Sequence, residues 1–172
     1  MSGAKTKPGE LRARRRPGRH SCWDHLIVAP LWVAYDANLG TLLRTCDAIG
    51  ACLAVPRTKH YLGALHHGDT LRGRRPCIHW VAPTKEGWID EQREAGKCIV
   101  AVELVEGATL LPWLAPARRS TVLLLGHEHN GVPDDVLVAV DECVEIPMVG
   151  RGASLNVAVA GSLVAYRLAG LS

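Results

Sequence analysis

The sequence of 172 residues contains no phenylalanine, and aromatic side chains make up only 5% of it. Its hydrophobic residues, 48% of the chain, are therefore mostly leucine, valine, isoleucine and alanine. Aliphatic residues of this kind are typical of parallel strands that are buried on both faces. The length suits one domain with a sizeable core. The composition therefore predicts a single α/β domain.

Long hydrophobic runs are also missing. Prolines interrupt the longest ones at Pro30, Pro56, Pro112 and Pro147, so no run approaches the length of a membrane span. The charged N-terminus is not followed by an apolar stretch, which argues against a secretory signal. We expect no membrane partner.

The six cysteines form no CxxC motif and show no paired metal-ligand spacing. We interpret all six as reduced thiols and expect a cytoplasmic protein. His20, Cys22 and His25 can be drawn as a metal cluster, but the spacing is loose and a fourth ligand is missing. A solvated tail with chance histidines is the better interpretation, and we expect no metal.

Charge is unevenly placed along the chain. Residues 1–20 contain seven lysines and arginines and one glutamate, which leaves 13 basic and 16 acidic side chains in the rest. A basic tail on a mildly acidic body is typical of nucleic-acid binding through phosphate groups, and equally of a disordered leader that aids solubility. We divide the chain into a flexible basic tail, residues 1–22, and one domain, residues 23–172. The arginines that would contact nucleic acid are Arg12, Arg14, Arg15, Arg16 and Arg19.

Strand and helix patterns alternate along the whole domain. Strands are predicted at residues 26–33, 52–55, 78–82, 98–102, 121–125 and 143–148. Helices are predicted at residues 39–49, 86–95, 110–114 and 133–140, and from Gly152 or Ser154 to Leu168. Residues 57–76 indicate a surface loop or a short helix. This order predicts a doubly wound, mainly parallel sheet with helices on both faces, whose ligands bind at the carboxyl ends of the strands.

Two of these strands end in glycine and polar residues, at Gly126 and Gly150. Glycine lets bare backbone approach a ligand closely, so the two loops indicate one ligand held between neighbouring strand ends. A dinucleotide fingerprint fails because Leu155 stands where the third glycine is needed, and no ribose-binding acid follows. A hydrolase elbow fails because Asn156 replaces its last glycine.

Three motifs in order resemble the SpoU (TrmH-like) branch of the SPOUT methyltransferases, over residues 26–170. The first is Asn38-x-Gly40-x-x-x-Arg44. The second is Leu124-Leu125-Gly126-x-Glu128-x-x-Gly131. The third is Ile146-Pro147-Met148-x-Gly150-x-x-x-Ser154-Leu155-Asn156-Val157.

The resemblance implies a homodimer that uses S-adenosylmethionine, and no metal, to methylate the ribose 2′-hydroxyl of a nucleotide in tRNA or rRNA. It also implies that the C-terminal segment forms a deep trefoil knot, which periodicity alone does not indicate. The expected cofactor-binding residues are Leu125, Gly126, Glu128, Gly131, Ile146, Met148, Gly150, Ser154, Leu155 and Asn156.

Arg44, Asn38 and Glu128 are the expected catalytic residues. Arg44 would also bind the RNA, because a guanidinium clamps a phosphate well and helps activate the neighbouring 2′-hydroxyl. Without the resemblance, a surface ion pair with Asp47 would explain Arg44 as well. Asn38 either orients Arg44 or caps its helix. Glu128 either accepts hydrogen bonds from backbone or Arg44, or is a solvated loop acid.

Three other functions stay open. The chain fits a non-catalytic RNA-binding protein that kept the knot, or a base methyltransferase of the same superfamily. An oxidoreductase is weakened by Leu155. The basic segment from His60 to Pro76 is either an RNA contact or a solvated loop.

Overall fold

The computed structural model describes residues 23–68 and 77–171, and seven strands within them form one sheet in the order β3-β2-β1-β6-β4-β7-β5. All neighbouring strands are parallel. The strands are β1 (Trp23–Ala29), β2 (Ala51–Pro56), β3 (Ile78–Val81), β4 (Cys98–Val102), β5 (Thr109–Leu110), β6 (Thr121–Leu124) and β7 (Glu142–Glu145). The predicted parallel α/β sheet is confirmed.

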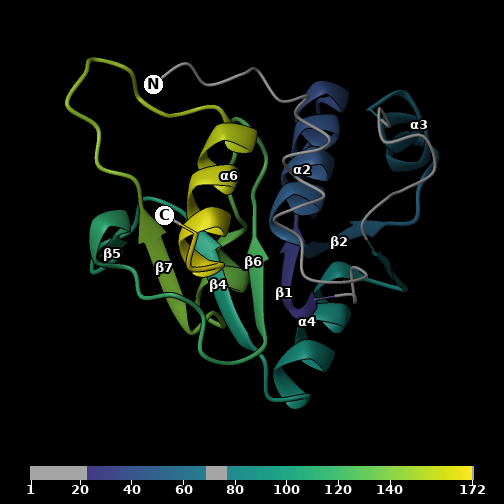
Figure 1. Ribbon diagram of the computed structural model, residues 1–172, viewed down its shortest axis with the longest axis horizontal. Helices are drawn as coiled ribbons and strands as arrows, with labels where there is room; N and C mark the ends of the chain where they lie inside the picture. The colour runs from purple at the N-terminus through teal and green to yellow at the C-terminus, as the bar shows by residue number, and fades with distance from the viewer. Residues whose placement is uncertain (1–22, 69–76, 172) are drawn as a thin grey trace, which may run out of the picture.

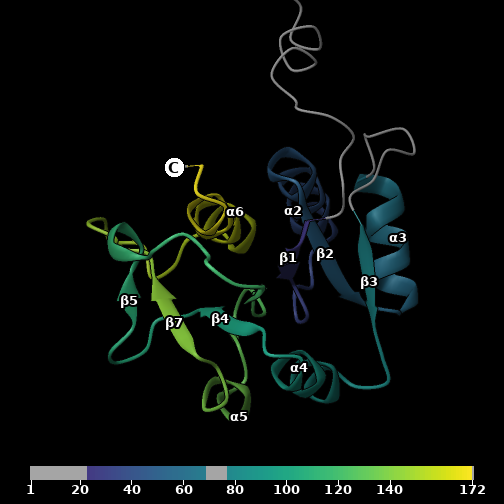
Figure 2. The same ribbon diagram turned by 60° about the horizontal axis from the view of Figure 1, so that its bottom comes forward.

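Helices cover both faces of this sheet, as predicted (Figures 1 and 2). One face carries α2 (Asp36–Ile49), α3 (Lys59–Gly68) and α6 (Val157–Leu168). The other carries α4 (Lys85–Glu94) and the single turn α5 (Asp134–Leu137). A 3-10 turn, Leu111–Trp113, follows β5.

Alternation along the strands builds two hydrophobic cores. In β1, Leu26 and Val28 pack toward α2 and α6, whereas Ile27 and Ala29 pack toward α4. Successive side chains of a strand point to opposite faces, so a strand between two helical layers is apolar throughout. This explains the uninterrupted apolar runs.

Several boundaries differ from the predicted ones. The first strand ends at Ala29 rather than residue 33, because Pro30 has no N–H to continue the ladder. The segment after it begins α2 at Asp36, with Tyr35 at the N-cap. The last helix begins at Val157, so neither Gly152 nor Ser154 starts it. Within residues 57–68 the short-helix alternative is correct, since α3 forms there.

Some predictions concern residues outside the described part of the chain, and one concerns how the chain is threaded. The basic tail with Arg12, Arg14, Arg15, Arg16 and Arg19 lies outside the described residues, as do residues 69–76. The threading of the chain into a knot stays a prediction. In the part of the chain that the structure describes, no helix combines the length and apolarity that a membrane crossing requires.

Candidate functional site

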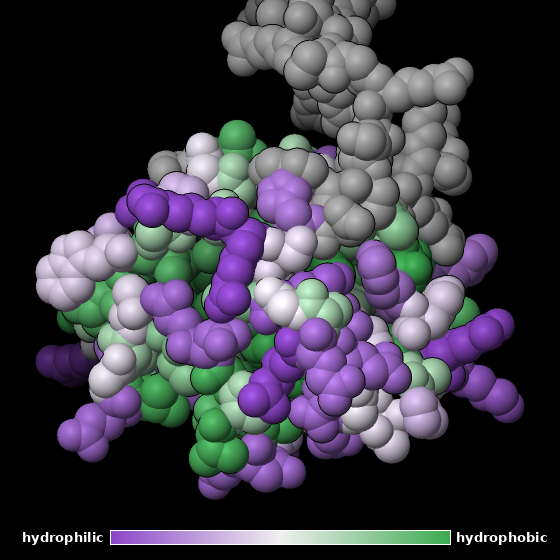
Figure 3. Space-filling view, turned by 90° about the horizontal axis from the view of Figure 1, so that it is seen from below, coloured by the Kyte–Doolittle hydropathy of each residue, from purple (hydrophilic) through white to green (hydrophobic). Residues whose placement is uncertain are grey.

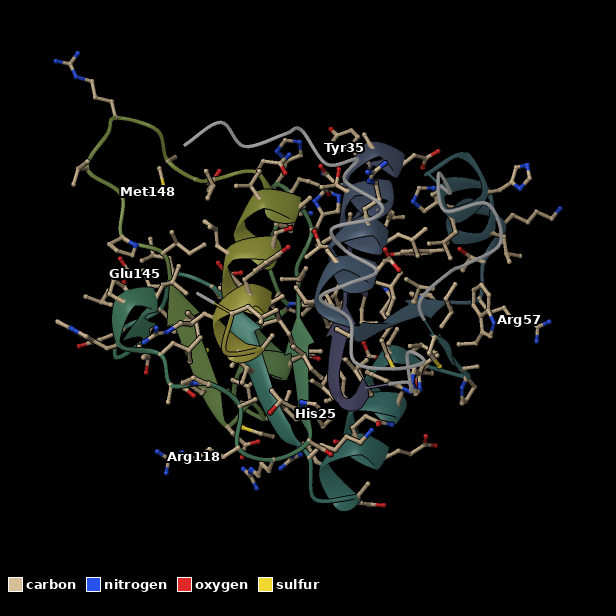
Figure 4. The ribbon with its side chains drawn as sticks, viewed as in Figure 1. His25, Tyr35, Arg57, Arg118, Glu145 and Met148 are labelled. Atoms are coloured by element: carbon tan, nitrogen blue, oxygen red, sulfur yellow. The ribbon has the colours of Figure 1, made fainter. Side chains whose placement is uncertain are left out.

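A cavity of about 690 Å³ opens at the carboxyl ends of β4, β6 and β7. Its walls come from the loops that follow these strands and from the start of α6. Figure 4 shows Glu145 at the end of β7 and Met148 on the long loop that leads to α6. The carboxyl edge of a parallel sheet is where ligands bind in such folds.

The loop after β6 folds back on itself through its glycines. Gly126 is buried, and a Cβ there would overlap the backbone of Gly131 and Val132. Gly131 has a φ of 68°, and its N–H and carbonyl pair with those of His127 at 2.9 Å. Glycine is needed at Gly126 for the close approach of the backbone and at Gly131 for the left-handed conformation. The cavity is therefore bounded by a tight, closed loop.

Glu128 ties this loop to the connection between β1 and α2. Its carboxylate accepts hydrogen bonds from the N–H groups of Ala34 at 3.0 Å and Tyr35 at 3.1 Å. It also accepts one from the Asn38 amide at 2.7 Å. Partial burial by itself would raise the pKa of Glu128, but these hydrogen bonds together outweigh it and lower the pKa. Glu128 therefore stays ionised and holds two chain segments together.

Asn38 connects Glu128 to the start of the last helix. The Asn156 side-chain N–H₂ donates to the Asn38 carbonyl oxygen at 3.0 Å, and its own oxygen accepts from Ala158 and Val159. A carboxylate only accepts, and a helix N-terminus only donates. The orientation of both amides is therefore determined. The prediction that Asn38 caps α2 is wrong, since Tyr35 is at the N-cap and Asn38 lies inside the helix. The alternative that Asn38 orients Arg44 stays a prediction.

The cavity contains most of the residues expected to hold the cofactor. Those that line it are Leu125, Gly126, Glu128, Gly131, Ile146, Met148, Ser154 and Leu155. Gly150 and Asn156 lie outside the lining, the first exposed and the second at the N-cap of α6. Cofactor binding by these residues stays a prediction.

Arg44 lies on the exposed side of α2 and outside the cavity lining. It is six residues from Asn38, or about 9 Å along the helix axis. Arg44 is therefore a surface residue of α2 and not part of the cavity wall.

Two carboxylates of the cavity were not predicted. Glu103 follows β4, and it accepts hydrogen bonds from Val132 N–H at 2.9 Å and Leu104 N–H at 3.1 Å. Glu145 ends β7 and lines the same space. The rule that strand ends meet at one edge would have indicated Glu103, which directly follows a predicted strand. Glu145 lies inside the strand predicted at residues 143–148, so its place at the strand end was not indicated.

A model of the SpoU rRNA Methylase family matches residues 25–166. The chain belongs to this family. The match spans every element described above except the start of β1 and the end of α6. The resemblance seen in the three motifs is thereby confirmed.

Members of the SpoU family from bacteria are similar over most of the chain. The 23S rRNA (guanosine(2553)-2′-O)-methyltransferase RlmP of Bacillus subtilis is 32% identical over 77% of the chain and 53% of its own length. The tRNA (guanosine(18)-2′-O)-methyltransferase of Escherichia coli K12 is 27% identical over 91% of the chain and 65% of its own length. The chain therefore spans between half and two thirds of these relatives.

Two solved structures share the fold. An AdoMet-bound rRNA methyltransferase from Sinorhizobium meliloti has a TM-score of 0.69 and 27% identity, and covers 83% of this chain and 55% of its own. A protein solved for the 2-OH methylation of C/U34 on tRNA has a TM-score of 0.72 and 26% identity, covering 85% of this chain and 95% of its own.

Proposed function

We propose that this chain is an S-adenosylmethionine-dependent methyltransferase acting on the ribose 2′-hydroxyl of a nucleotide in tRNA or rRNA. The observation that carries the proposal is the cavity at the carboxyl edge of the sheet, which eight of the ten expected residues line. The names of the two bacterial relatives and the AdoMet-bound neighbour support the same activity. We place the enzyme in the cytoplasm, where both classes of RNA are found.

The charge of the cavity fits this cofactor. Glu103, Glu128 and Glu145 line it, and no lysine or arginine is among its described lining residues. S-Adenosylmethionine carries a sulfonium and an ammonium group, which nearby carboxylates stabilise. A nicotinamide dinucleotide carries a pyrophosphate, which they repel. The cavity therefore argues against the oxidoreductase.

Size and apolar walls fit as well. A cavity of about 690 Å³ is within the usual range for a small-molecule site. Leu125 and Leu155 would cover the adenine ring, and backbone groups of the loops would supply its in-plane hydrogen bonds. When bound there, the cofactor would supply an electrophilic methyl group.

Arg44 would act on the RNA side of the reaction. Its guanidinium can bind the phosphate next to the reacting ribose and stabilise negative charge that develops on the 2′-oxygen. The hydrogen bonds among Glu128, Asn38 and Asn156 would hold α2 against the cavity loop. Arg44, which lies on α2, would then keep a fixed position relative to that loop.

A second copy of the chain is our proposal for the partner at the α2–α6 face. These helices lie side by side (Figure 1) and are joined by a 2.7 Å hydrogen bond between Thr45 and Ser162. Val159, Leu163 and Tyr166 form an apolar stripe on α6 and are 45%, 44% and 37% exposed. Arg44 precedes Thr45 on α2 and is exposed. Because it is also absent from its own cavity lining, we infer that it serves the cavity of the other copy.

The activity is tested with Arg44→Ala and total RNA. We expect the variant to bind S-adenosylhomocysteine as the wild type does and to lose methyl transfer. Digestion of the wild-type product to nucleosides should place the label on ribose. Label on a base would instead indicate a base methyltransferase. Absence of label with wild-type protein would indicate a non-catalytic RNA-binding protein.

The dimer is tested by mixing two inactive variants. Arg44→Ala keeps an intact cavity, and Leu155→Arg places a long charged side chain where the adenine ring would bind. If each arginine serves the other copy, mixed dimers contain one complete site, and mixing restores part of the activity. If each arginine serves its own cavity, the mixture stays inactive.

A further inference from the structure

We propose that Cys52, Cys77 and His79 form a zinc site at the amino ends of β2 and β3. One ligand atom from each of the three residues lies within 4.8 Å of the other two. This site is remote from the proposed methyl-transfer cavity, which lies at the carboxyl ends of the strands. The sequence predicted no metal, because Cys52 is far in sequence from Cys77 and His79 and the three form no recognisable motif.

Strand register brings the three side chains together. Leu53 lies opposite Ile78, and Ala54 lies opposite His79, so Cys52 lies opposite Cys77. Side chains two residues apart share a face of a sheet. Cys77 and His79 therefore point to the same side as Cys52, which packs in the core that faces α4. Cys77 and His79 on one strand and Cys52 on its neighbour therefore provide three potential metal ligands.

The distances suit a tetrahedral ion. Zinc binds thiolate at about 2.3 Å and imidazole at about 2.0–2.1 Å, which puts neighbouring ligand atoms of a tetrahedron about 3.6 Å apart. The Cys77 sulfur and the His79 Nε2 atom are 3.8 Å apart. Small rotations of the side chains would close the remaining distance. Two sulfurs and one nitrogen favour zinc over magnesium or calcium, which prefer oxygen ligands.

Burial and charge also fit a bound cation. Cys52 is fully buried, whereas Cys77 and His79 lie nearer the surface, so an ion can enter and water can be the fourth ligand. Both cysteines bind as thiolates and release their protons to solvent. Two thiolates and a neutral imidazole cancel the charge of Zn²⁺, which avoids an unpaired charge in this partly buried place.

The site would fasten an edge of the sheet. Within the described residues β3 is the last strand on its side and pairs with β2 alone. The three residues also lie at the end of the sheet where the strands begin. In Figure 4 His25 on β1 marks this end, and Tyr35 at the top of α2 marks the opposite end. The view from below in Figure 3 shows a mainly hydrophilic surface here, with smaller hydrophobic groups between. Because β3 is short, it makes few backbone hydrogen bonds to β2. A metal bridge would add a link between these two strands.

The experiment titrates full-length, chelator-treated, reduced protein with Co²⁺ and then with Zn²⁺. We expect one equivalent of Co²⁺ to give a thiolate charge-transfer band and tetrahedral d–d bands, both displaced by Zn²⁺. Cys77→Ser and His79→Gln should each weaken binding at least about tenfold. Cys143→Ser, which alters a described cysteine outside the cluster, should bind as the wild type does.

Three results would overturn the proposal. They are a wild type without the charge-transfer band, unchanged binding in Cys77→Ser and His79→Gln, and loss of binding in Cys143→Ser. Circular dichroism checks that each variant is folded. If Cys77→Ser does not fold, His79→Gln decides, because it removes a ligand without altering a cysteine.

Discussion

Gly126 shows how strongly a single backbone position shapes the cavity. An added Cβ overlaps the backbone of Gly131 and Val132, which cannot move aside as a side chain can. We expect Gly126→Ala to lower the free energy of unfolding by about 1–3 kcal/mol and to weaken binding of S-adenosylhomocysteine at least about tenfold. Calorimetry and urea unfolding measure the two effects.

The matched control is Gly63→Ala in α3, where a Cβ would meet no atom within 4 Å. Alanine favours a helix over glycine by about 1 kcal/mol, so this variant should be slightly more stable and bind normally. Equal behaviour of the two variants would show that the overlap is relieved at no cost.

Glu128 gives the stability a defined pH dependence. Its pKa is lower in the folded protein than the ordinary value of 4.5. The unfolded chain therefore takes up the proton first as pH falls, and the stabilisation is present above pH 4.5 and is lost as pH falls through the folded pKa. Urea unfolding of wild type and Glu128→Gln should show a gap that is constant at neutral pH and shrinks in acid. A gap independent of pH would mean that Glu128 is not held by these hydrogen bonds.

At this scale the sequence predicted residue types better than their partners. The motifs placed Glu128, Asn38 and Asn156 near one site, and the structure joins them by hydrogen bonds. Which amide atom faces which neighbour depends on contacts between residues 90 and 118 positions apart. Local spacing carries no information about such contacts, so the link from Asn38 to Glu128 and Asn156 was not predicted.

At the scale of elements, Asn156 both caps α6 and links it to α2. Asn156→Ala removes both functions and should lower the free energy of unfolding by about 1 kcal/mol or more. Asn156→Asp keeps an oxygen for the helix N–H groups, but it places a second carboxylate beside Asn38. It should therefore retain more stability than alanine in urea unfolding while weakening cofactor binding. Equal losses of stability would show that the cap contributes little.

The long buried strands and the long helices were predictable because their periodicity spans many residues. The helices predicted at residues 133–140 and 110–114 are present only as the single turn α5 and the 3-10 turn Leu111–Trp113. Two-residue β5 was not predicted, because it has too few residues to show a period. β7 also stops at Glu145, since the following Ile146 and Met148 turn toward the cavity instead of continuing the ladder.

At the scale of the whole molecule, the basic tail concerns affinity for RNA. Removal of residues 1–20 deletes seven positive charges and one negative charge. If the tail contacts phosphates, RNA binding weakens and the slope of log affinity against log salt becomes shallower. Filter binding at several salt concentrations measures both. An unchanged slope would make the tail incidental to RNA binding.

The strand order also determines how the chain can fold during synthesis. β1 lies between β2 and β6, yet β6 begins only at Thr121. Until about a hundred residues after β1 have left the ribosome, one of its edges has no native neighbour. An open apolar strand can pair with other chains, and long-range parallel pairing is slow to form. The newly made N-terminal half should therefore be the stage at which this protein most needs a chaperone.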